Sequence, residues 1–132
     1  MEKTFPARRD EMPNVTAFVE EILESLDCPM REMMQISVAV EEIFINIASY
    51  AYPNVDGSTK ITIESSDHGI EIAFIDKGVP FNPLEMKDPD VEAKAEDDSI
   101  GGLGIFMVKQ TMDKVAYEYA ENSNVLRIKK TW

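Results

Sequence analysis

The chain has 132 residues, of which 44% are hydrophobic and 29% charged, a length and composition that predict one soluble globular domain with its own core. Its net charge of −12, from 25 acidic and 13 basic residues, argues against nucleic acid and anionic membrane surfaces as partners, because both bind clustered Lys and Arg. Cys28 is the only cysteine, which excludes an intrachain disulfide and is typical of a reducing, cytoplasmic setting. We expect no signal peptide and no membrane span, since no segment has about eighteen consecutive apolar residues.

The first half of the chain predicts two helices behind a short strand. Residues 3–5 can form an edge strand, and apolar residues recur at helical spacing over residues 13–27. Cys28-Pro29 breaks this pattern, and a second helix is predicted from about Met30 to Tyr50. Pro, Asn, Asp and Gly over residues 52–58 then predict a turn.

The second half predicts two β-hairpins separated by an irregular segment and a helix. The irregular segment is rich in Pro and acidic residues, and one this long is usually a lid or binding loop, or else disordered. Because helices and strands come in blocks, we expect an α+β fold with the helices on one face of a sheet. The expected elements are, in order, strands 59–66 and 69–76, the irregular segment 77–100, a helix over 101–113, and strands 114–120 and 124–132.

A narrow polar stripe runs along the second predicted helix. At about 100° per residue, Asn46 lies roughly 40° from Glu42 around the helix axis, while Glu41 lies about 100° away and can face water. Val38 and Ile45 border the stripe, so Glu42 and Asn46 are recessed between apolar side chains rather than surrounded by polar ones. A solvated helix face is the alternative, but a recessed carboxylate and amide need partners, which favours a site.

A glycine-rich stretch opens the third predicted helix. Gly101, Gly102 and Gly104 let the backbone approach an anion, and the helix that follows offers free N–H groups to it. A simple tight turn is an equally weighted alternative, and no Lys-Ser/Thr pair follows, so this is not a P-loop. In so acidic a chain a phosphate group would need Mg²⁺, for which Asn46 offers a hard oxygen ligand.

Asp76 ends the second strand of the first hairpin and is followed two residues later by Gly78. A carboxylate at a strand end is a good acceptor for an exocyclic amine such as that of adenine. The alternative is a turn-forming Asp beside a permissive Gly.

Taken together, these motifs resemble the GHKL ATPase superfamily, which includes gyrase, histidine kinases and the MutL repair proteins. The shared pattern is Glu-x-x-x-Asn on a helix, Asp-x-Gly after a strand, a long loop, and Gly-Gly-Leu-Gly opening a helix. The stretches "EEIFINIASYAYP", "DKGVPFNPL" and "GGLGIFMVKQTMDKVAYEY" look more specifically like the anti-sigma factor serine kinase branch. The resemblance covers about Phe5 to Lys130.

This resemblance implies a Bergerat-type two-layer α/β sandwich, with a mixed, mostly antiparallel sheet and three helices on one face. It implies a single domain over residues 1–132 that binds ATP with Mg²⁺ under a lid at about 77–100. By the same resemblance, Glu42 is the general base and Asn46 the Mg²⁺ ligand. The nucleotide-binding positions that the resemblance and the glycine-rich stretch give are Asp76 and Gly78 at the adenine, and Gly101, Gly102, Leu103 and Gly104 at the phosphates.

The sequence departs from the family pattern at two places. Relatives often carry a threonine near the last hairpin that reaches the nucleotide, and the corresponding stretch "ENSNVLRI" gives no residue for that role. The first box reads Asp-Lys-Gly-Val-Pro, without a second glycine, and the acidic lid has no evident basic residue for the γ-phosphate. Binding of ATP without phosphotransfer is therefore an open alternative.

The function that the resemblance implies is that of an anti-sigma factor with serine/threonine kinase activity. It would sequester a sigma factor, phosphorylate a STAS-domain antagonist protein, and form a homodimer. Two alternatives are a nucleotide-gated binding module without phosphotransfer and the catalytic domain of a histidine kinase. The second is weak, because His68, the only histidine, falls in a predicted hairpin turn.

Overall fold

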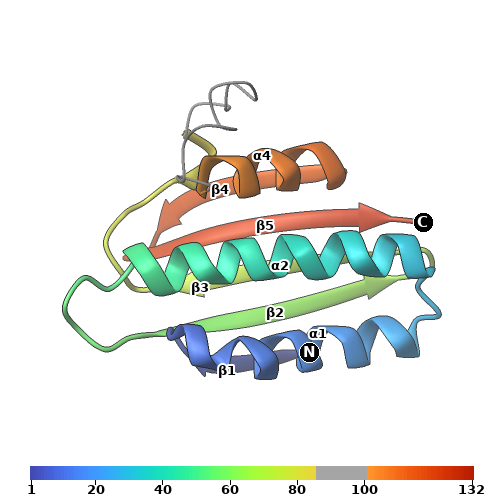
Figure 1. The fold of residues 1–132 in the computed structure, drawn as a ribbon, viewed down its shortest axis with the longest axis horizontal. Helices are drawn as coiled ribbons and strands as arrows, with labels where there is room; N and C mark the ends of the chain where they lie inside the picture. The colour runs from blue at the N-terminus through green and yellow to red at the C-terminus, as the bar shows by residue number, and fades with distance from the viewer. Residues whose placement is uncertain (86–100) are drawn as a thin grey trace.

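The computed structural model describes residues 1–85 and 101–132, which fold into a five-stranded sheet with helices packed on it (Figure 1). Short 3₁₀ helices, η1 and η2, precede α1 and follow the loop after β3. In chain order, the elements are β1 Glu2–Pro6, η1 Arg9–Glu11, α1 Met12–Ser25, α2 Met30–Tyr50, β2 Ser58–Ser66, β3 Gly69–Asp76, η2 Pro83–Glu85, α4 Gly101–Thr111, β4 Lys114–Ala120 and β5 Ser123–Thr131.

The strand order is β1-β2-β3-β5-β4, and each of the four pairings is antiparallel. Both hairpins expected from the sequence, β2–β3 and β4–β5, are confirmed, and they meet where β3 pairs with β5. The sheet was expected to be mixed and mostly antiparallel; among the described strands it contains no parallel pair. His68 lies in the turn between β2 and β3, as predicted.

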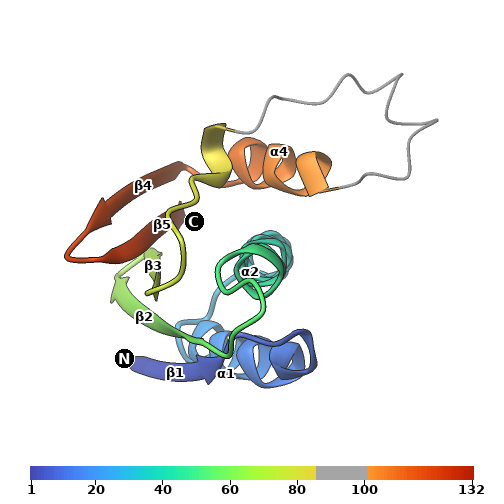
Figure 2. The ribbon, with the colours of Figure 1, turned by 90° about the vertical axis from the view of Figure 1, so that its left-hand side faces the viewer.

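All described helices lie on one side of the sheet, which Figure 2 shows with the strands nearly end-on. The helix α2 lies between α1 and α4 and contacts both. Alternate residues of the central strands, including Ile61 of β2 and Phe74 of β3, point into this layer and are fully buried. Against them packs the apolar stripe of α2, in which Ile36, Ile43 and Phe44 are fully buried. This two-layer α+β arrangement confirms the expected fold.

The predicted boundaries of helices and strands hold to within a few residues, and backbone conformation accounts for one helix end and one hairpin turn. Asp27 adopts a left-handed backbone conformation (φ 55°), which ends the run of α1 before Cys28. Glu121 and Asn122 both have positive φ, 54° and 60°, as a tight turn between antiparallel strands β4 and β5 requires. Within the described part of the chain, no helix is long and apolar enough to cross a membrane.

Candidate functional site

Asp76, the last residue of β3, is buried with only 4% of its surface exposed. Its Oδ1 accepts hydrogen bonds from the backbone N–H of Gly78 and from Nδ2 of Asn124, both at 2.9 Å. Burial raises the pKa of this carboxyl, while the two hydrogen bonds oppose that rise. No described group donates to Oδ2, so one oxygen of a buried carboxyl is left for a ligand.

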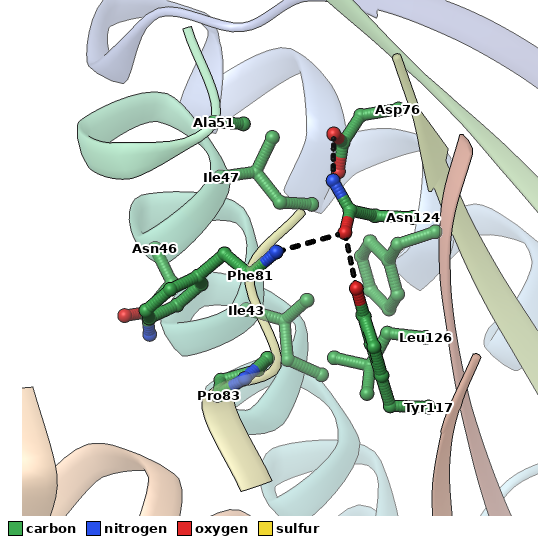
Figure 3. Close-up of a pocket in the computed structure, with 11 residues that line it drawn as sticks. Ile43, Asn46, Ile47, Ala51, Asp76, Phe81, Pro83, Tyr117, Asn124 and Leu126 are labelled. Carbon is green, nitrogen blue, oxygen red and sulfur yellow. Dashed lines mark hydrogen bonds between the residues drawn. The ribbon is translucent and has the colours of Figure 1, made fainter. Parts of the chain in front are cut away.

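Asn124 of β5 stands opposite Asp76 in the β3–β5 register and joins several parts of the site. Besides Asp76, its Nδ2 donates to the carbonyl of Val79 at 2.9 Å. Its Oδ1 accepts from the backbone N–H of Phe81 at 3.0 Å and from the hydroxyl of Tyr117 (Figure 3). Asn124 therefore connects the segment after β3 to β5 and holds one carboxylate oxygen of Asp76 in place.

These groups line a pocket between α2 and the sheet, with about 360 Å³ of free space including its mouth. Its walls are mainly apolar, and its polar lining comes from a few convergent groups. The lining residues are Ile43, Asn46, Ile47, Ala51, Phe74, Asp76, Phe81, Pro83, Tyr117, Asn124 and Leu126.

Asn46 reaches this pocket from α2, across from Asp76 (Figure 3). It is 5% exposed, and its side-chain N–H donates to the backbone carbonyl of Glu42 at 2.8 Å. Because a carbonyl can only accept, the amide nitrogen must face Glu42, which leaves Oδ1 without a partner among the described residues. An amide oxygen held in this way is a suitable ligand for Mg²⁺.

A magnesium ion at this site would need most of its ligands from elsewhere. Within the described residues, no group of three or more His, Cys, Asp and Glu side chains gathers to hold a metal. Since Mg²⁺ usually keeps several waters and binds phosphate oxygens, one amide ligand with a phosphate chain fits its chemistry. The residues present therefore fit a metal that arrives with a nucleotide rather than one bound alone.

Glu42 lies one helical turn before Asn46, outside the pocket lining and against the first turn of α4. A Cβ built on Gly104 would lie 1.9 Å from Oε2 of Glu42, so the absence of a side chain there makes room for the carboxylate. Glu42 is half-buried, and burial, with a smaller effect of Glu41, raises its pKa. A carboxylate with a raised pKa and no described hydrogen-bond partner is suited to accept a proton.

Gly78 has a packing role that is separate from any ligand. A Cβ at this position would lie 2.2 Å from the backbone oxygen of Ala51, at the end of α2. The adjacent residue Val79 donates its backbone N–H to that same oxygen at 2.8 Å. Gly78 therefore allows the strand end to approach α2 closely, which holds Asp76 and Asn46 across one pocket.

The predicted phosphate cradle begins α4 itself. Gly101, Gly102, Leu103 and Gly104 form the first turn of the helix, rather than a loop before it. The predicted lid, 77–100, is described only over its first part, where residues 77–85 contain η2 and line the pocket through Phe81 and Pro83. Its acidic second part lies outside the described residues.

Sequence reasoning placed Asp76, Asn46 and Glu42 on the correct elements but missed Asn124, Tyr117 and Phe81. The stretch around Asn124 was noted only because it lacks a threonine. The signal for Asn124 was the register: once β3 and β5 pair, Asp76 and Asn124 face each other.

Comparison with known proteins identifies the family to which the chain belongs. The family described as "Histidine kinase-like ATPase domain" matches residues 5–130, nearly the whole chain. The chain belongs to this family.

Relatives of this ATPase-family chain are named as serine-protein kinases or as an anti-sigma factor. It is 23% identical over 133 residues to serine-protein kinase RsbW of Bacillus mycoides, covering 98% of this chain and 83% of the relative. It is 28% identical over 130 residues to RsbW of Halalkalibacterium halodurans, covering 96% and 78%. An anti-sigma F factor of Clostridium beijerinckii is 27% identical over 115 residues, covering 86% and 77%.

A solved structure supports the fold of the family. The catalytic domain of histidine kinase ThkA, in a nucleotide-free form, aligns over 99% of this chain and 97% of its own, with a TM-score of 0.55. Because the two sequences are only 15% identical, this likeness concerns the fold alone.

Proposed function

We propose that this domain binds ATP with Mg²⁺ and acts as a cytoplasmic anti-sigma regulatory kinase. In this proposal it sequesters a sigma factor, phosphorylates a serine or threonine of a STAS-type antagonist protein, and works as a homodimer. The observation that carries the proposal is the buried Asp76, which keeps one oxygen free at the floor of a pocket that Asn46 enters from the opposite side. The names and coverage of the relatives support the regulatory part.

Purine recognition is assigned to the free Oδ2 of Asp76. An exocyclic amine can donate to this oxygen, whereas a carbonyl in the same place would face a carboxylate and be rejected. The apolar lining, with Ile43, Ile47 and Leu126, suits the faces of a planar base. The pocket therefore favours a purine that carries an amine at this edge.

Phosphate chemistry is assigned to the junction of α2 and α4. When bound, Mg-ATP supplies the γ-phosphoryl group and the metal ion supplies the positive charge that the lining lacks. The first turn of α4 offers backbone N–H groups to the phosphates, and Asn46 offers its Oδ1 to the metal. Glu42 takes the proton of the attacking hydroxyl, which is the general-base role that its raised pKa suits.

Two measurements test the proposal in order. Isothermal titration calorimetry with ATP and MgCl₂ should show binding for the wild type and at least a tenfold weaker binding for Asp76→Asn, because the amide places an N–H donor or a weaker acceptor at the purine amine. Labelled ATP with a STAS-domain protein should then give phosphoserine or phosphothreonine. Unchanged affinity in Asp76→Asn, or no affinity in the wild type, contradicts the proposal.

The neighbouring carboxylates provide a matched control for catalysis. Glu42→Ala should abolish phosphotransfer while keeping ATP affinity, and Glu41→Ala, which removes a half-buried carboxylate one residue away, should keep both. If ATP binds but no label transfers even to the wild type, the function is that of a nucleotide-gated binding module. One observation favours this second candidate: among the described residues that line the pocket there is no Lys or Arg.

A further inference from the structure

Arg9, in the short helix η1, reaches across to the helix α2. Its Nη2 donates a hydrogen bond to Oγ of Ser49 at 3.0 Å, a contact between residues 40 positions apart in the chain. The backbones of η1 and α2 also lie side by side. Arg9 is exposed and Ser49 is half-buried. The hydrogen bond therefore places a positive charge on the exposed side of α2, near the C-terminal end of this helix.

Ser49 belongs to the polar stripe of α2 that carries the proposed site. It follows Asn46 by three residues and Glu42 by seven, so at about 100° per residue it lies about 60° from Asn46 and about 20° from Glu42 around the helix axis. Residues three apart on a helix have Cβ atoms about 5–6 Å apart, so Nη2 of Arg9 lies within about 10 Å of the Asn46 Cβ. Arg9 is thus held beside the residues assigned to the metal and to proton transfer.

The charge of Arg9 is not paired with an acid within the described residues. No described carboxylate forms an ion pair with its guanidinium, although the chain has 25 acidic and 13 basic residues. The preceding residue, Arg8, pairs with both Asp10 at 3.1 Å and Glu11 at 3.4 Å. Arg9 instead uses one of its five N–H donors on a neutral hydroxyl, and its other donors have no partner in the described part of the chain.

The proposed nucleotide site needs a cation of this kind. Among the described residues that line the base pocket there is no Lys or Arg. Lys77, the basic residue next to Asp76, lines a different hollow together with Lys60 and Arg127. Magnesium neutralises only part of the charge of a triphosphate, and a net charge of −12 repels the remainder. A guanidinium suits this task, because its planar N–H groups bind phosphate oxygens in pairs.

From this placement we propose that Arg9 is a phosphate-contacting residue, whose guanidinium binds non-bridging oxygens of the triphosphate. The inference rests on the ATP binding proposed above and adds to it a residue from an element that precedes α1. Ser49 is the positioning residue, since its hydroxyl holds the long arginine side chain near the phosphates and so reduces the conformational entropy lost on binding. The affinity for ATP then depends on Arg9, whereas the affinity for a nucleoside without phosphates does not.

A comparison of ATP with adenosine tests the inference. The variant is Arg9→Gln, which removes the charge and keeps a polar side chain. In calorimetry with MgCl₂, the ATP affinity of this variant should fall about tenfold or more, because charge-assisted hydrogen bonds to phosphate are lost. Adenosine affinity, measured by NMR titration because it is expected to be weaker, should stay the same as in the wild type. An equal loss for both compounds would overturn the inference, since it would place the effect at the base pocket.

Two further variants separate contact from long-range charge. Arg8→Gln removes the same charge one residue earlier, from a side chain paired with Asp10 and Glu11, and should keep the ATP affinity of the wild type. Ser49→Ala should weaken ATP binding severalfold, and it should add nothing to Arg9→Gln, because the two residues act through one hydrogen bond. A loss in Arg8→Gln equal to that in Arg9→Gln, or additive losses for Ser49 and Arg9, would overturn the inference. Thermal unfolding of each variant should match that of the wild type, since exposed contacts contribute little to stability.

Phosphotransfer kinetics distinguish a phosphate contact from a contact with the protein that is phosphorylated. Arg9→Gln should raise the KM for ATP and leave the KM for a STAS-domain acceptor unchanged. Normal ATP affinity with a raised KM for the acceptor would overturn the inference, because Arg9 would then contact the partner protein. Normal ATP binding by the wild type and by Arg9→Gln alike contradicts only this inference. A wild type that binds no ATP contradicts the proposed function, and this inference with it.

Discussion

Asn124 uses its full hydrogen-bonding capacity inside the protein. Its two N–H hydrogens serve Asp76 and the carbonyl of Val79, and its oxygen accepts from Phe81 and Tyr117. It therefore has nothing left for a ligand. Asn124 thus orders the pocket, and under the proposed function the contact to the base falls to Asp76.

Replacing Asn124 with Asp should destabilise the fold by about 2–4 kcal/mol at pH 8. The variant places a carboxylate 2.9 Å from Oδ1 of Asp76, so that one of the two carboxyls holds a proton in the folded state well above the usual pKa. The folded state then binds more protons than the unfolded state, and stability falls as pH rises through that interval. Urea unfolding at pH 5 and pH 8 should show the smaller loss at pH 5.

The control for this variant is Asn122→Asp in the exposed β4–β5 turn. Asn and Asp both tolerate the left-handed conformation found there, φ 60°, so stability should change by less than about 0.5 kcal/mol at either pH. Equal losses for Asn124→Asp at pH 5 and pH 8 would contradict the assigned repulsion.

Two glycines of the site should respond in opposite ways to alanine. Gly78→Ala places a methyl group against the backbone of Ala51, which cannot rotate away, so we expect a loss of about 1–3 kcal/mol. Gly104→Ala meets only the end of the Glu42 side chain and gains about 1 kcal/mol of helix propensity. Its stability should be kept, while phosphotransfer should fall tenfold or more because the carboxylate is displaced.

Thermal unfolding and labelled-ATP transfer, measured on both variants, decide this comparison. If Gly104→Ala unfolds at a clearly lower temperature than the wild type, the glycine serves packing rather than the position of Glu42. If Gly78→Ala is as stable as the wild type, the close approach to Ala51 does not hold.

At the scale of elements, the site depends on how the end of α2 is joined to the end of β3. Tyr52, just beyond α2, donates its hydroxyl to the carbonyl of Ser58 at 2.6 Å and accepts the backbone N–H of Lys77 at 2.9 Å. One hydroxyl thus connects the start of β2 with the residue after Asp76. The position of the carboxylate is set by a connection between elements rather than by β3 alone.

Tyr52→Phe should therefore weaken both the fold and the site. The change removes two hydrogen bonds and leaves a backbone N–H and a carbonyl without them, for an expected loss of about 1–2 kcal/mol in urea unfolding. ATP affinity should fall severalfold in calorimetry, because the strand end is less firmly held.

Tyr50→Phe is a close control for this prediction. Tyr50 is about half exposed and packs its ring on Phe81, but its hydroxyl makes no hydrogen bond within the described residues. Its stability and ATP affinity should match those of the wild type. An effect of Tyr50→Phe as large as that of Tyr52→Phe would mean that the aromatic packing, not the hydroxyl, matters.

At the scale of the whole molecule, the fold followed from local patterns and the site only in part. Over residues 59–66 and 69–76, the alternation of apolar and polar residues determines which face of each strand is buried. This pattern is local, so it can be recognised without knowing which distant residues are in contact. Asp76 and Asn46 were likewise visible, because each breaks an apolar pattern. Asn124 was missed because its contact with Asp76 spans 48 residues and exists only once β3 and β5 pair.

The net charge of −12 leads to a prediction about how the stability of the fold responds to salt. Repulsion among the excess acidic residues opposes the compact state, and salt screens it, so raising NaCl from about 20 to 500 mM should raise Tm by about 3–5 °C in a dilute, monomeric sample. The effect should vanish near pH 4.4, where the net charge approaches zero. A Tm that falls with salt would mean that attractive ion pairs outweigh the net repulsion.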